Sequence, residues 1–267
     1  MICFPNAKIN LGLRIINKRT DGYHNIETIF YPIPLKDALE IVSAPSFSFK
    51  QVGVPIHDTP QKNLVMKALD AFMQNYEIPP VEIYLKKVIP LGAGLGGGSS
   101  DASFMLKLLN DFTDLHLPEE TLEEMAAPLG ADCPFFIKNR PVLASGIGNI
   151  FEEIKLSLKG YIIYIVKPDV LVSTKEAYAL VEPTKPTFSL KEIIQYPVKE
   201  WKNMLVNDFE RSVFKQYPII SNIKDKLYQL GSVYASMSGS GSSVYGLFEQ
   251  DIELTFQDSF VWKGKLE

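Results

Sequence analysis

The chain has 267 residues, of which 46% are hydrophobic, 11% aromatic and 22% charged, and its net charge is −4 at pH 7. This composition is typical of a globular protein and excludes a disordered or fibrous chain, and the acidic balance argues against a nucleic acid as the main partner. Two cysteines and three histidines are too few for a disulfide framework or a structural zinc site. At about 150 residues per domain, we expect two domains.

Targeting and membrane-spanning segments are not expected. Pro5, Asn6 and Lys8 interrupt what would be the apolar core of a signal peptide, and no basic segment precedes them. No stretch approaches the roughly 18 uncharged apolar residues that a membrane-spanning helix needs. We therefore expect a reduced, cytoplasmic protein without a membrane partner.

In the first half of the chain, alternating and β-branched residues predict strands that are joined by turns. The expected strands are 8–16, 24–30, 39–42 and 81–88. A charged turn at 17–22 joins the first two, and Pro32 and Pro34 are expected to end the second. Apolar residues at helical spacing predict helices at 60–76 and 100–112.

The second half of the chain continues this mixture. The apolar segment 135–137 predicts a strand, and the glycine-containing turn 146–149 is our choice for the domain boundary. Ser173 and Glu176 form a capping-box pattern that opens a helix. The other expected elements are strands 161–166, 233–237 and 243–248, helices 201–214 and 219–230, and a loop at 182–186. This irregular order of strands and helices is typical of an α+β protein.

A glycine-rich loop between a predicted strand and a predicted helix is the most informative segment. Five of the seven residues from Gly92 to Gly98 are glycine, which is costly in backbone entropy. Bare backbone amides that approach a ligand explain this cost, and the following helix N-terminus favours an anion such as phosphate. Ser99 and Ser100 can then bond phosphate oxygens or Mg²⁺. Alternatively, the turn binds nothing and one of these serines caps the helix.

Other phosphate-binding motifs fit this loop poorly. Gly92, Gly94 and Gly97 formally match a dinucleotide-binding fingerprint, but a long segment precedes them and residues 118–120 look like a helix start rather than a ribose-binding acid. The Gly-Lys-Ser/Thr of a Walker A loop and the catalytic triplets of protein kinases do not occur.

The loop alone is too weak to bind a nucleotide. A helix N-terminus contributes roughly 0.3–2 kcal/mol to an anion, whereas micromolar affinity needs about 8 kcal/mol. A cation, a base pocket and Mg²⁺ must add the rest. Lys86 and Lys87, just before the loop, are the nearest cations; the alternative is that they are solvated lysines at a strand end.

Three segments together resemble the motifs of the GHMP small-molecule kinases: Ala7–Leu11, the glycine loop with its serines, and Ser238–Ser242. Arg19–Thr28 and Gly130–Phe136 are similar to motifs of the members that act on a CDP-linked methylerythritol. The resemblance implies ATP-dependent phosphorylation of the 2-hydroxyl of that substrate, with Mg²⁺, in the non-mevalonate (MEP) isoprenoid route. We expect a monomer or weak homodimer.

The same resemblance implies a two-domain GHMP kinase fold. Residues 1–150 would form an N-terminal ribosomal-protein-S5-like α/β domain that binds ATP, and residues 151–267 a ferredoxin-like α+β domain that contributes to the substrate site. The active site would lie in the cleft between them.

Asp132 matches the catalytic aspartate of the family and Lys8 matches its partner lysine. A carboxylate within hydrogen-bond reach can accept the proton that the substrate hydroxyl loses, and an ammonium can favour the ionised carboxylate and offset transition-state charge. The alternatives are a turn or cap role for Asp132 and a solvated edge-strand position for Lys8.

The remaining site residues are also carried over by resemblance. Tyr23 and His24 match a cytidine-binding pair, because an aromatic face can stack on cytosine and an imidazole can bond its polar edge; the alternative is a surface hairpin. The expected substrate-binding residues are Asn10, Tyr23, His24, Thr174, Tyr178, Gly239 and Ser240. The expected ATP-binding residues are Asn63, Lys87, Pro90, Gly92, Gly94, Leu95, Gly96, Gly97, Gly98, Ser99 and Ser100, with Ser100 also a candidate Mg²⁺ ligand.

Two other functions remain open at this stage. One is a GHMP enzyme acting on another alcohol such as homoserine or mevalonate, which leaves the Asp21–His24 segment without a purpose. The other is a non-catalytic nucleotide-binding protein, which leaves Lys8 and Asp132 without one. By itself the 238–242 segment would pass for a flexible hairpin. We expect structural or incidental roles for the segment 207–210 and for Cys133, His57 and His116.

Overall fold

The computed structural model describes residues 1–55, 59–179, 181, 183 and 188–267. His57 and most of the expected loop at 182–186 lie outside this part of the chain. The chain forms two compact units. Unit 1 comprises Met1–Ala7, Leu35–Leu91 and Gly96–Arg140, and unit 2 comprises Lys8–Pro34, Gly92–Leu95 and Pro141–Glu267. These units group residues by contact, so the functional domain limits of 1–150 and 151–267 stay a prediction.

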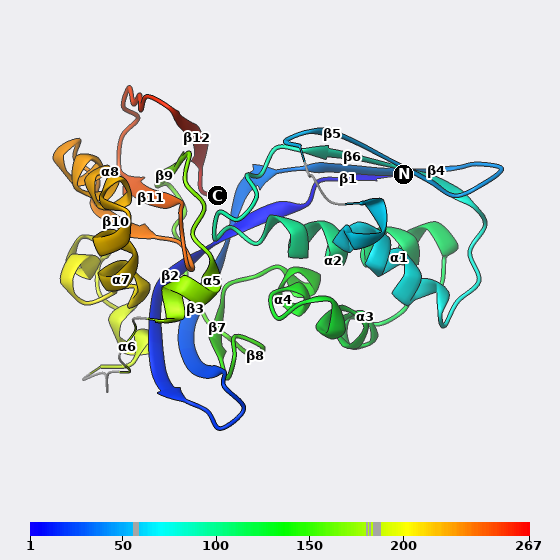
Figure 1. Cartoon of the computed structure of the whole chain (residues 1–267), viewed down its shortest axis with the longest axis horizontal. Helices are drawn as coiled ribbons and strands as arrows, with labels where there is room; N and C mark the ends of the chain where they lie inside the picture. The colour runs from blue at the N-terminus through cyan, green and yellow to red at the C-terminus, as the bar shows by residue number, and fades with distance from the viewer. Residues whose placement is uncertain (56–58, 180, 182, 184–187) are drawn as a thin grey trace. The chain divides into compact units, whose positions relative to one another are not determined.

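Unit 1 is built on a four-stranded sheet (Figure 1). Its strands are, in spatial order, β1 (Ile2–Cys3), β4 (Ala38–Ser43), β6 (Val81–Lys87) and β5 (Ser48–Gly53). β4 pairs antiparallel with both β1 and β6, while β5 runs parallel to β6. β6 ends at Lys87, and residues 88–91 lead from the sheet into the glycine loop.

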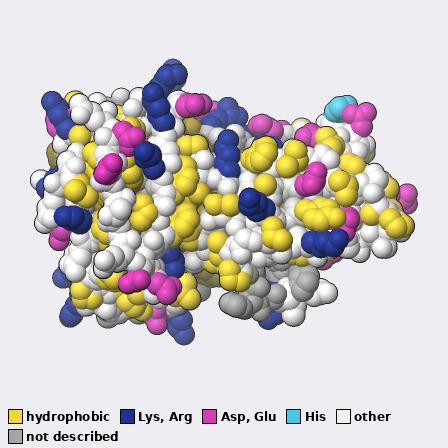
Figure 2. Space-filling model, turned by 90° about the horizontal axis from the view of Figure 1, so that it is seen from above, with side chains coloured by type: hydrophobic (Ala, Val, Ile, Leu, Met, Phe, Trp, Pro, Cys, Tyr) yellow, Lys and Arg dark blue, Asp and Glu magenta, His cyan; other side chains and the backbone are white. Residues whose placement is uncertain are grey.

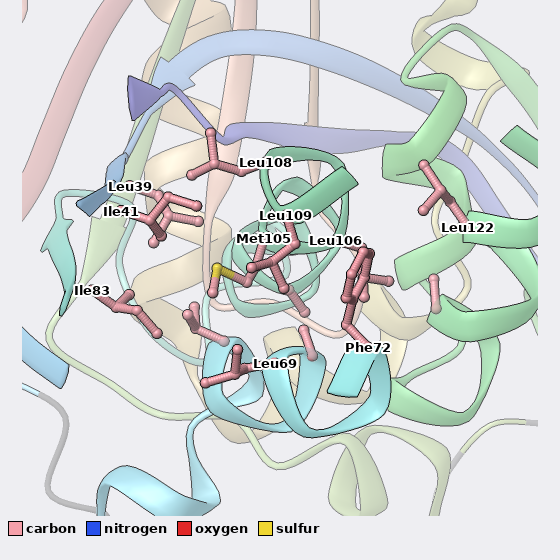
Figure 3. Packing of buried hydrophobic residues seen from close by; sticks show 14 of the residues in the cluster. Leu39, Ile41, Leu69, Phe72, Ile83, Met105, Leu106, Leu108, Leu109 and Leu122 are labelled. Atoms are coloured by element: carbon pink, nitrogen blue, oxygen red, sulfur yellow. The ribbon is translucent and has the colours of Figure 1, made fainter. Parts of the chain in front are cut away.

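The helices of unit 1 share one hydrophobic core with this sheet. They are α1 (Leu64–Met73), α2 (Gly97–Thr113), α3 (Glu119–Ala126) and α4 (Cys133–Lys138), with single 3₁₀ turns at Pro60–Lys62 and Ala127–Leu129. Figure 3 shows Met105 and Leu109 of α2 in one cluster with Leu69 of α1 and Ile83 of β6. Each of these side chains is at least 98% buried, and full burial of such a residue stabilises the fold by about 1.5–3 kcal/mol. α2 is therefore firmly anchored behind the loop.

Two expectations for unit 1 are wrong in detail. The segment 135–137 lies in helix α4 rather than in a strand. Because its side chains are buried all round, the apolar run carries no helical period, whereas Pro134 fits the first turn of a helix. Helix α2 begins at Gly97, three residues before the expected start at Ser100.

A sheet with the order β2-β3-β7-β8 belongs to unit 2, apart from the first residues of β2 and the last residues of β3. Its strands are β2 (Asn6–Lys18), β3 (His24–Lys36), β7 (Val142–Ser145) and β8 (Ile150–Glu153). β3 does not end at Pro32 as expected but continues through Pro34. Proline keeps an extended φ, and β7 pairs only with residues 28–30, before the first proline. The turn at 146–149 joins β7 to β8 of the same sheet.

The second sheet of unit 2 is antiparallel throughout, in the order β10-β11-β9-β12. Its strands are β9 (Ile162–Pro168), β10 (Tyr234–Met237), β11 (Val244–Phe248) and β12 (Ser259–Lys265). The helices of unit 2 are α5 (Thr174–Ala179), α6 (Leu190–Ile193), α7 (Phe209–Gln216) and α8 (Pro218–Gln229), and a 3₁₀ segment lies at Val198–Asn203. The expected helix 201–214 is thus divided into that 3₁₀ segment and α7. The capping box is confirmed, since the Glu176 amide donates to Ser173 Oγ and the Ser173 amide donates to Glu176.

Among the described residues, no helix has both the length and the apolar character that crossing a bilayer requires. On the face shown in Figure 2, Lys and Arg side chains lie singly among acidic and apolar ones.

Candidate functional site

The second half of the glycine loop begins helix α2 in unit 1. Gly96 is the N-cap residue with φ 69°, and Gly97 is the first helical residue. Ser99 and Ser100 therefore lie inside the first turn, so the alternative that one of them caps the helix is wrong. Helix geometry leaves the amides of Gly97, Gly98 and Ser99 without intrahelical partners, whereas the Ser100 amide donates to the Gly96 carbonyl (2.9 Å). The helix dipole makes this end partly positive.

Only one of the two glycines that begin α2 is required by the packing of the protein. A Cβ at Gly97 would lie 2.8 Å from both Ile89 Cγ2 and Lys87 Nζ. A Cβ at Gly98 would meet, among the described residues, only Leu64 Cδ1 at 3.5 Å, which is an ordinary contact. The protein interior therefore does not explain why residue 98 lacks a side chain, whereas the close approach of an anion to the amides does.

The first half of the glycine loop, Gly92–Leu95, belongs to unit 2 and packs against the turn between β10 and β11. Gly94 has φ 74°, and a Cβ there would lie 1.9 Å from the Ser238 carbonyl oxygen. Ser238 Oγ donates to the Gly94 carbonyl (2.8 Å), and the Lys8 amide donates to the Leu95 carbonyl (3.0 Å). Two segments that the sequence singled out separately are thus brought together with β2.

Lys8 and Asn10 lie on β2 and point into the interior of unit 2. Their side chains are 3% and 2% exposed, so the solvated alternative for Lys8 is wrong. Lys8 Nζ donates to Asn10 Oδ1 (2.6 Å) and lies 4.6 Å from the ring centroid of Phe30. Asn10 Nδ2 in turn donates to Thr28 Oγ1 (2.9 Å), which orients the amide toward the ammonium. The arrangement holds a buried positive charge in a fixed position.

Asp132 of unit 1 is half-buried and immediately precedes helix α4. Its φ of −84° and ψ of −13° are helical, and in the described structure its carboxylate makes no capping hydrogen bond to α4. The cap role therefore does not account for this residue. Burial raises the pKa of the adjacent Cys133 thiol to about 11, so this thiol stays protonated near pH 7 and is a poor nucleophile.

Aromatic side chains from distant segments meet in unit 2. The rings of His24 and Tyr178 stack with centroids 4.8 Å apart and an interplanar angle of 18°, and Phe209 packs edge-on against Tyr178. Tyr23 is 62% exposed. Burial, followed by the charge of Lys18, lowers the pKa of His24, so its imidazole is neutral at pH 7 and can both donate and accept.

Two other expected substrate residues also meet in unit 2. Thr174 Oγ1 lies 3.3 Å from Ser240 Oγ. Gly239 has φ 56°, and a Cβ there would lie 3.4 Å from Asn10 Oδ1. The expected substrate residues of unit 2 therefore form two local groups, one of hydroxyls and backbone and one of aromatic rings.

Lys87 and Asn63 of unit 1 have structural partners that the sequence did not indicate. Lys87 is 2% exposed, and its ammonium pairs with Asp37 and with Asp101 Oδ2 (2.9 Å), so the solvated alternative is wrong for Lys87, whereas Lys86 is exposed. Asn63 caps α1, because its Oδ1 accepts the Val65 amide (2.9 Å). Contacts of either residue with ATP stay a prediction.

Metal ligation rests on few side chains. In the described residues, no group of three or more His, Cys, Asp or Glu side chains could hold an ion. Ser100 Oγ is fully buried and has no hydrogen-bond partner within this part of the chain. As a hydroxyl oxygen it suits Mg²⁺ chemically, and Mg²⁺ commonly keeps water and substrate phosphates as its other ligands.

Several residues of these groups were missed from the sequence. Asp37 has no motif to mark it, Thr28 was only the last residue of the segment Arg19–Thr28, and Asp101 was only a residue of the predicted helix 100–112. Asn207 Nδ2 donates to the carbonyls of Met237 and Gly239 (both 2.8 Å), which supports the structural role expected for the segment 207–210.

Comparison with known proteins shows full-length similarity. Family models described as "GHMP kinases N terminal domain" and "GHMP kinases C terminal" match residues 63–140 and 190–256. The chain is 61% identical over 270 residues to the 4-diphosphocytidyl-2-C-methyl-D-erythritol kinase of Parabacteroides distasonis, and 58% identical over 274 residues to that of Bacteroides fragilis, with 100% of each chain covered.

Solved structures of related kinases have a similar fold. A crystal structure of 4-(cytidine 5'-diphospho)-2C-methyl-D-erythritol kinase matches with a TM-score of 0.80 and 32% identity, covering 93% of this chain and 90% of that one. The mevalonate kinase of Methanococcus jannaschii shares the fold, with a TM-score of 0.70 and 15% identity over 100% of this chain and 98% of that one.

Proposed function

Because the chain belongs to the 4-diphosphocytidyl-2-C-methyl-D-erythritol kinases of the GHMP family, we propose that it transfers the γ-phosphoryl group of ATP to the 2-hydroxyl of 4-diphosphocytidyl-2-C-methyl-D-erythritol. The products are the 2-phosphate and ADP, a step of non-mevalonate (MEP) isoprenoid synthesis. The two-domain, mixed α+β GHMP kinase fold expected from the sequence is confirmed. We further propose action in the cytoplasm, as a monomer or weak homodimer.

The observation in the molecule that best supports this function is the bare N-terminus of α2. Gly98 keeps the amides of the first turn open although packing does not require a glycine there. We propose that these amides and the loop Gly92–Gly96 hold the phosphates of ATP, with Asn63 and Lys87 near its base. Mg²⁺, with Ser100 as a candidate ligand, would neutralise phosphate charge.

Asp132 is proposed to accept the proton of the substrate 2-hydroxyl as its oxygen bonds to the γ-phosphorus. The bond from that phosphorus to the β,γ-bridging oxygen breaks, and ADP leaves. Phosphoryl transfer depends mainly on positioning and charge stabilisation, so Lys8 is proposed to offset negative charge in the transition state. Its fixed hydrogen bond to Asn10 leaves the ammonium little freedom to turn away.

Replacing Tyr178 by Ala is expected to raise the KM for the CDP substrate about 5- to 150-fold, because stacking one base on an aromatic ring is worth about 1–3 kcal/mol. The Tyr178→Phe variant keeps the ring and should stay within a few-fold of the wild type. Tyr196→Ala, on an exposed tyrosine outside both groups, serves as the control. Steady-state kinetics with each substrate varied separately provide the measurement, and an unchanged KM in Tyr178→Ala would remove the ring from cytidine binding.

The proposed reaction is tested by the substrates it requires. ADP release should occur only when ATP, Mg²⁺ and 4-diphosphocytidyl-2-C-methyl-D-erythritol are all present. Homoserine, mevalonate and methylerythritol phosphate without the cytidine group should give only background release. Equally fast release with homoserine or mevalonate would overturn the proposed substrate but keep the kinase, and no release with any alcohol would overturn both.

A further inference from the structure

Three buried charged residues of unit 1 lie behind the residues that enter and leave the glycine loop, and they take no direct part in the proposed phosphoryl transfer. We call Asp37, Lys87 and Asp101 the carboxylate–lysine triad. Asp37 precedes β4, Lys87 ends β6 and Asp101 lies in the second turn of α2. The exposed fractions of the three residues are 1%, 2% and 2%. Charged groups are rarely buried so completely unless they are paired.

The triad joins the two flanks of the loop. The Lys87 ammonium contacts Asp37 Oδ2 and donates to Asp101 Oδ2 at 2.9 Å. Asp37 Oδ1 accepts the backbone amides of Val88 (2.5 Å) and Ile89 (2.8 Å), the two residues that follow β6. One carboxylate therefore holds the chain entering the loop, and the other holds the helix leaving it.

The first residue of α2 rests directly on this triad. The closest atoms to a Cβ at Gly97 are Lys87 Nζ and Ile89 Cγ2, both at 2.8 Å. A displacement of the lysine side chain or of residues 88–89 would therefore move the helix start. Burial raises the pKa of Asp101, and the nearby charge of Lys87 opposes this shift.

We propose that the triad is a positioning device that fixes residues 88–91 and 96–100, so that the amides of the α2 N-terminus are held ready for phosphate. This inference rests on the proposed function for its ligand. Lys87 then supports ATP binding through the position of the loop. Its ammonium already has two carboxylate partners, so it is poorly suited to serve as the main cation for the phosphates.

The competing explanation is direct contact between the Lys87 side chain and the nucleotide. Two variants separate the explanations. Lys87→Met leaves two buried carboxylates without their cation, whereas Lys87→Met/Asp37→Asn/Asp101→Asn removes all three charges together. If Lys87 acts by positioning the loop, the triple variant recovers the ATP affinity and the slow amide exchange that the Lys87→Met variant loses. If it touches ATP, both variants lose the contact equally. Lys50→Met, on an exposed lysine of the same sheet, is the control.

Amide hydrogen exchange without nucleotide and the KM values of both substrates are the readouts. In Lys87→Met, we expect exchange of amides 88–91 and 96–100 to be at least tenfold faster and the KM for ATP at least tenfold higher, with the KM for the CDP substrate within twofold. The triple variant should recover most of both changes. Unchanged exchange in Lys87→Met, or an equal loss of ATP affinity in the triple variant, would overturn the proposal.

Asp101→Asn is a milder variant that tests the proposal if Lys87→Met does not fold. Asp101→Asn retains the pair of Lys87 with Asp37, so exchange should accelerate at 96–100 but stay as in the wild type at 88–91. Acceleration at both segments or at neither would contradict the assignment of each carboxylate to one flank. If the wild type does not bind ATP at all, the proposed function fails, while the exchange results still decide the role of the triad.

Discussion

Turnover of the Asp132→Asn variant is expected to be about 10²–10⁴-fold lower than that of the wild type, the usual worth of a general acid–base group. Asparagine keeps the shape of the side chain but cannot accept the proton of the substrate hydroxyl. The KM for ATP should stay within a few-fold, because we propose that the nucleotide is bound by the loop and α2. The measurement is kcat with both substrates saturating.

Two controls make this result specific. Asp114→Asn, on an exposed carboxylate paired with His116, should turn over like the wild type. The thermal midpoint of Asp132→Asn, measured beside that of the wild type, shows whether the variant is folded at the assay temperature. Wild-type kcat in Asp132→Asn would remove Asp132 from the mechanism.

Gly98→Ala is expected to weaken ATP binding at least tenfold without destabilising the protein. The new methyl group meets only an ordinary contact with Leu64 among the described residues, and alanine in place of a helical glycine favours the fold by about 0.5–1 kcal/mol. The same methyl group would stand between the first-turn amides and a phosphate. Calorimetric titration with ATP and denaturant unfolding measure the two effects separately.

Gly97→Ala provides the contrast for this variant. Its methyl group would collide with Lys87 and Ile89, so this variant should lose stability as well as ATP affinity. Wild-type ATP affinity in a stably folded Gly98→Ala would mean that no ligand approaches the first turn of α2 at that point.

The parts of the fold that the sequence predicted are those with a local signal. Strand β2 alternates over a long stretch, the capping box of α5 consists of residues three positions apart, and Gly92–Gly98 stands between a strand and a helix. Each pattern is complete within one segment. Helix α4 was misjudged because Cys133–Ile137 are all buried and their apolar side chains show no period.

The contacts that give the site residues their environment are not local. Lys8 on a strand at the end of its sheet order looks solvated in the sequence, but Phe30 and Asn10 enclose its ammonium. Lys87 looks available for phosphate, but Asp37, which is 50 residues away along the chain, pairs with it. The stacking of His24 on Tyr178 likewise joins distant segments. Such pairs depend on how strands and helices are arranged, and no motif encodes them.

The proposed function depends on binding of the ATP triphosphate by the amides at the start of α2. Amide hydrogen exchange with and without a non-hydrolysable ATP analogue and Mg²⁺ tests it most directly. We expect residues 96–100 to become strongly protected from exchange on nucleotide binding, while exchange of the α8 amides stays unchanged. Nucleotide binding that leaves residues 96–100 exchanging at the free rate would contradict it.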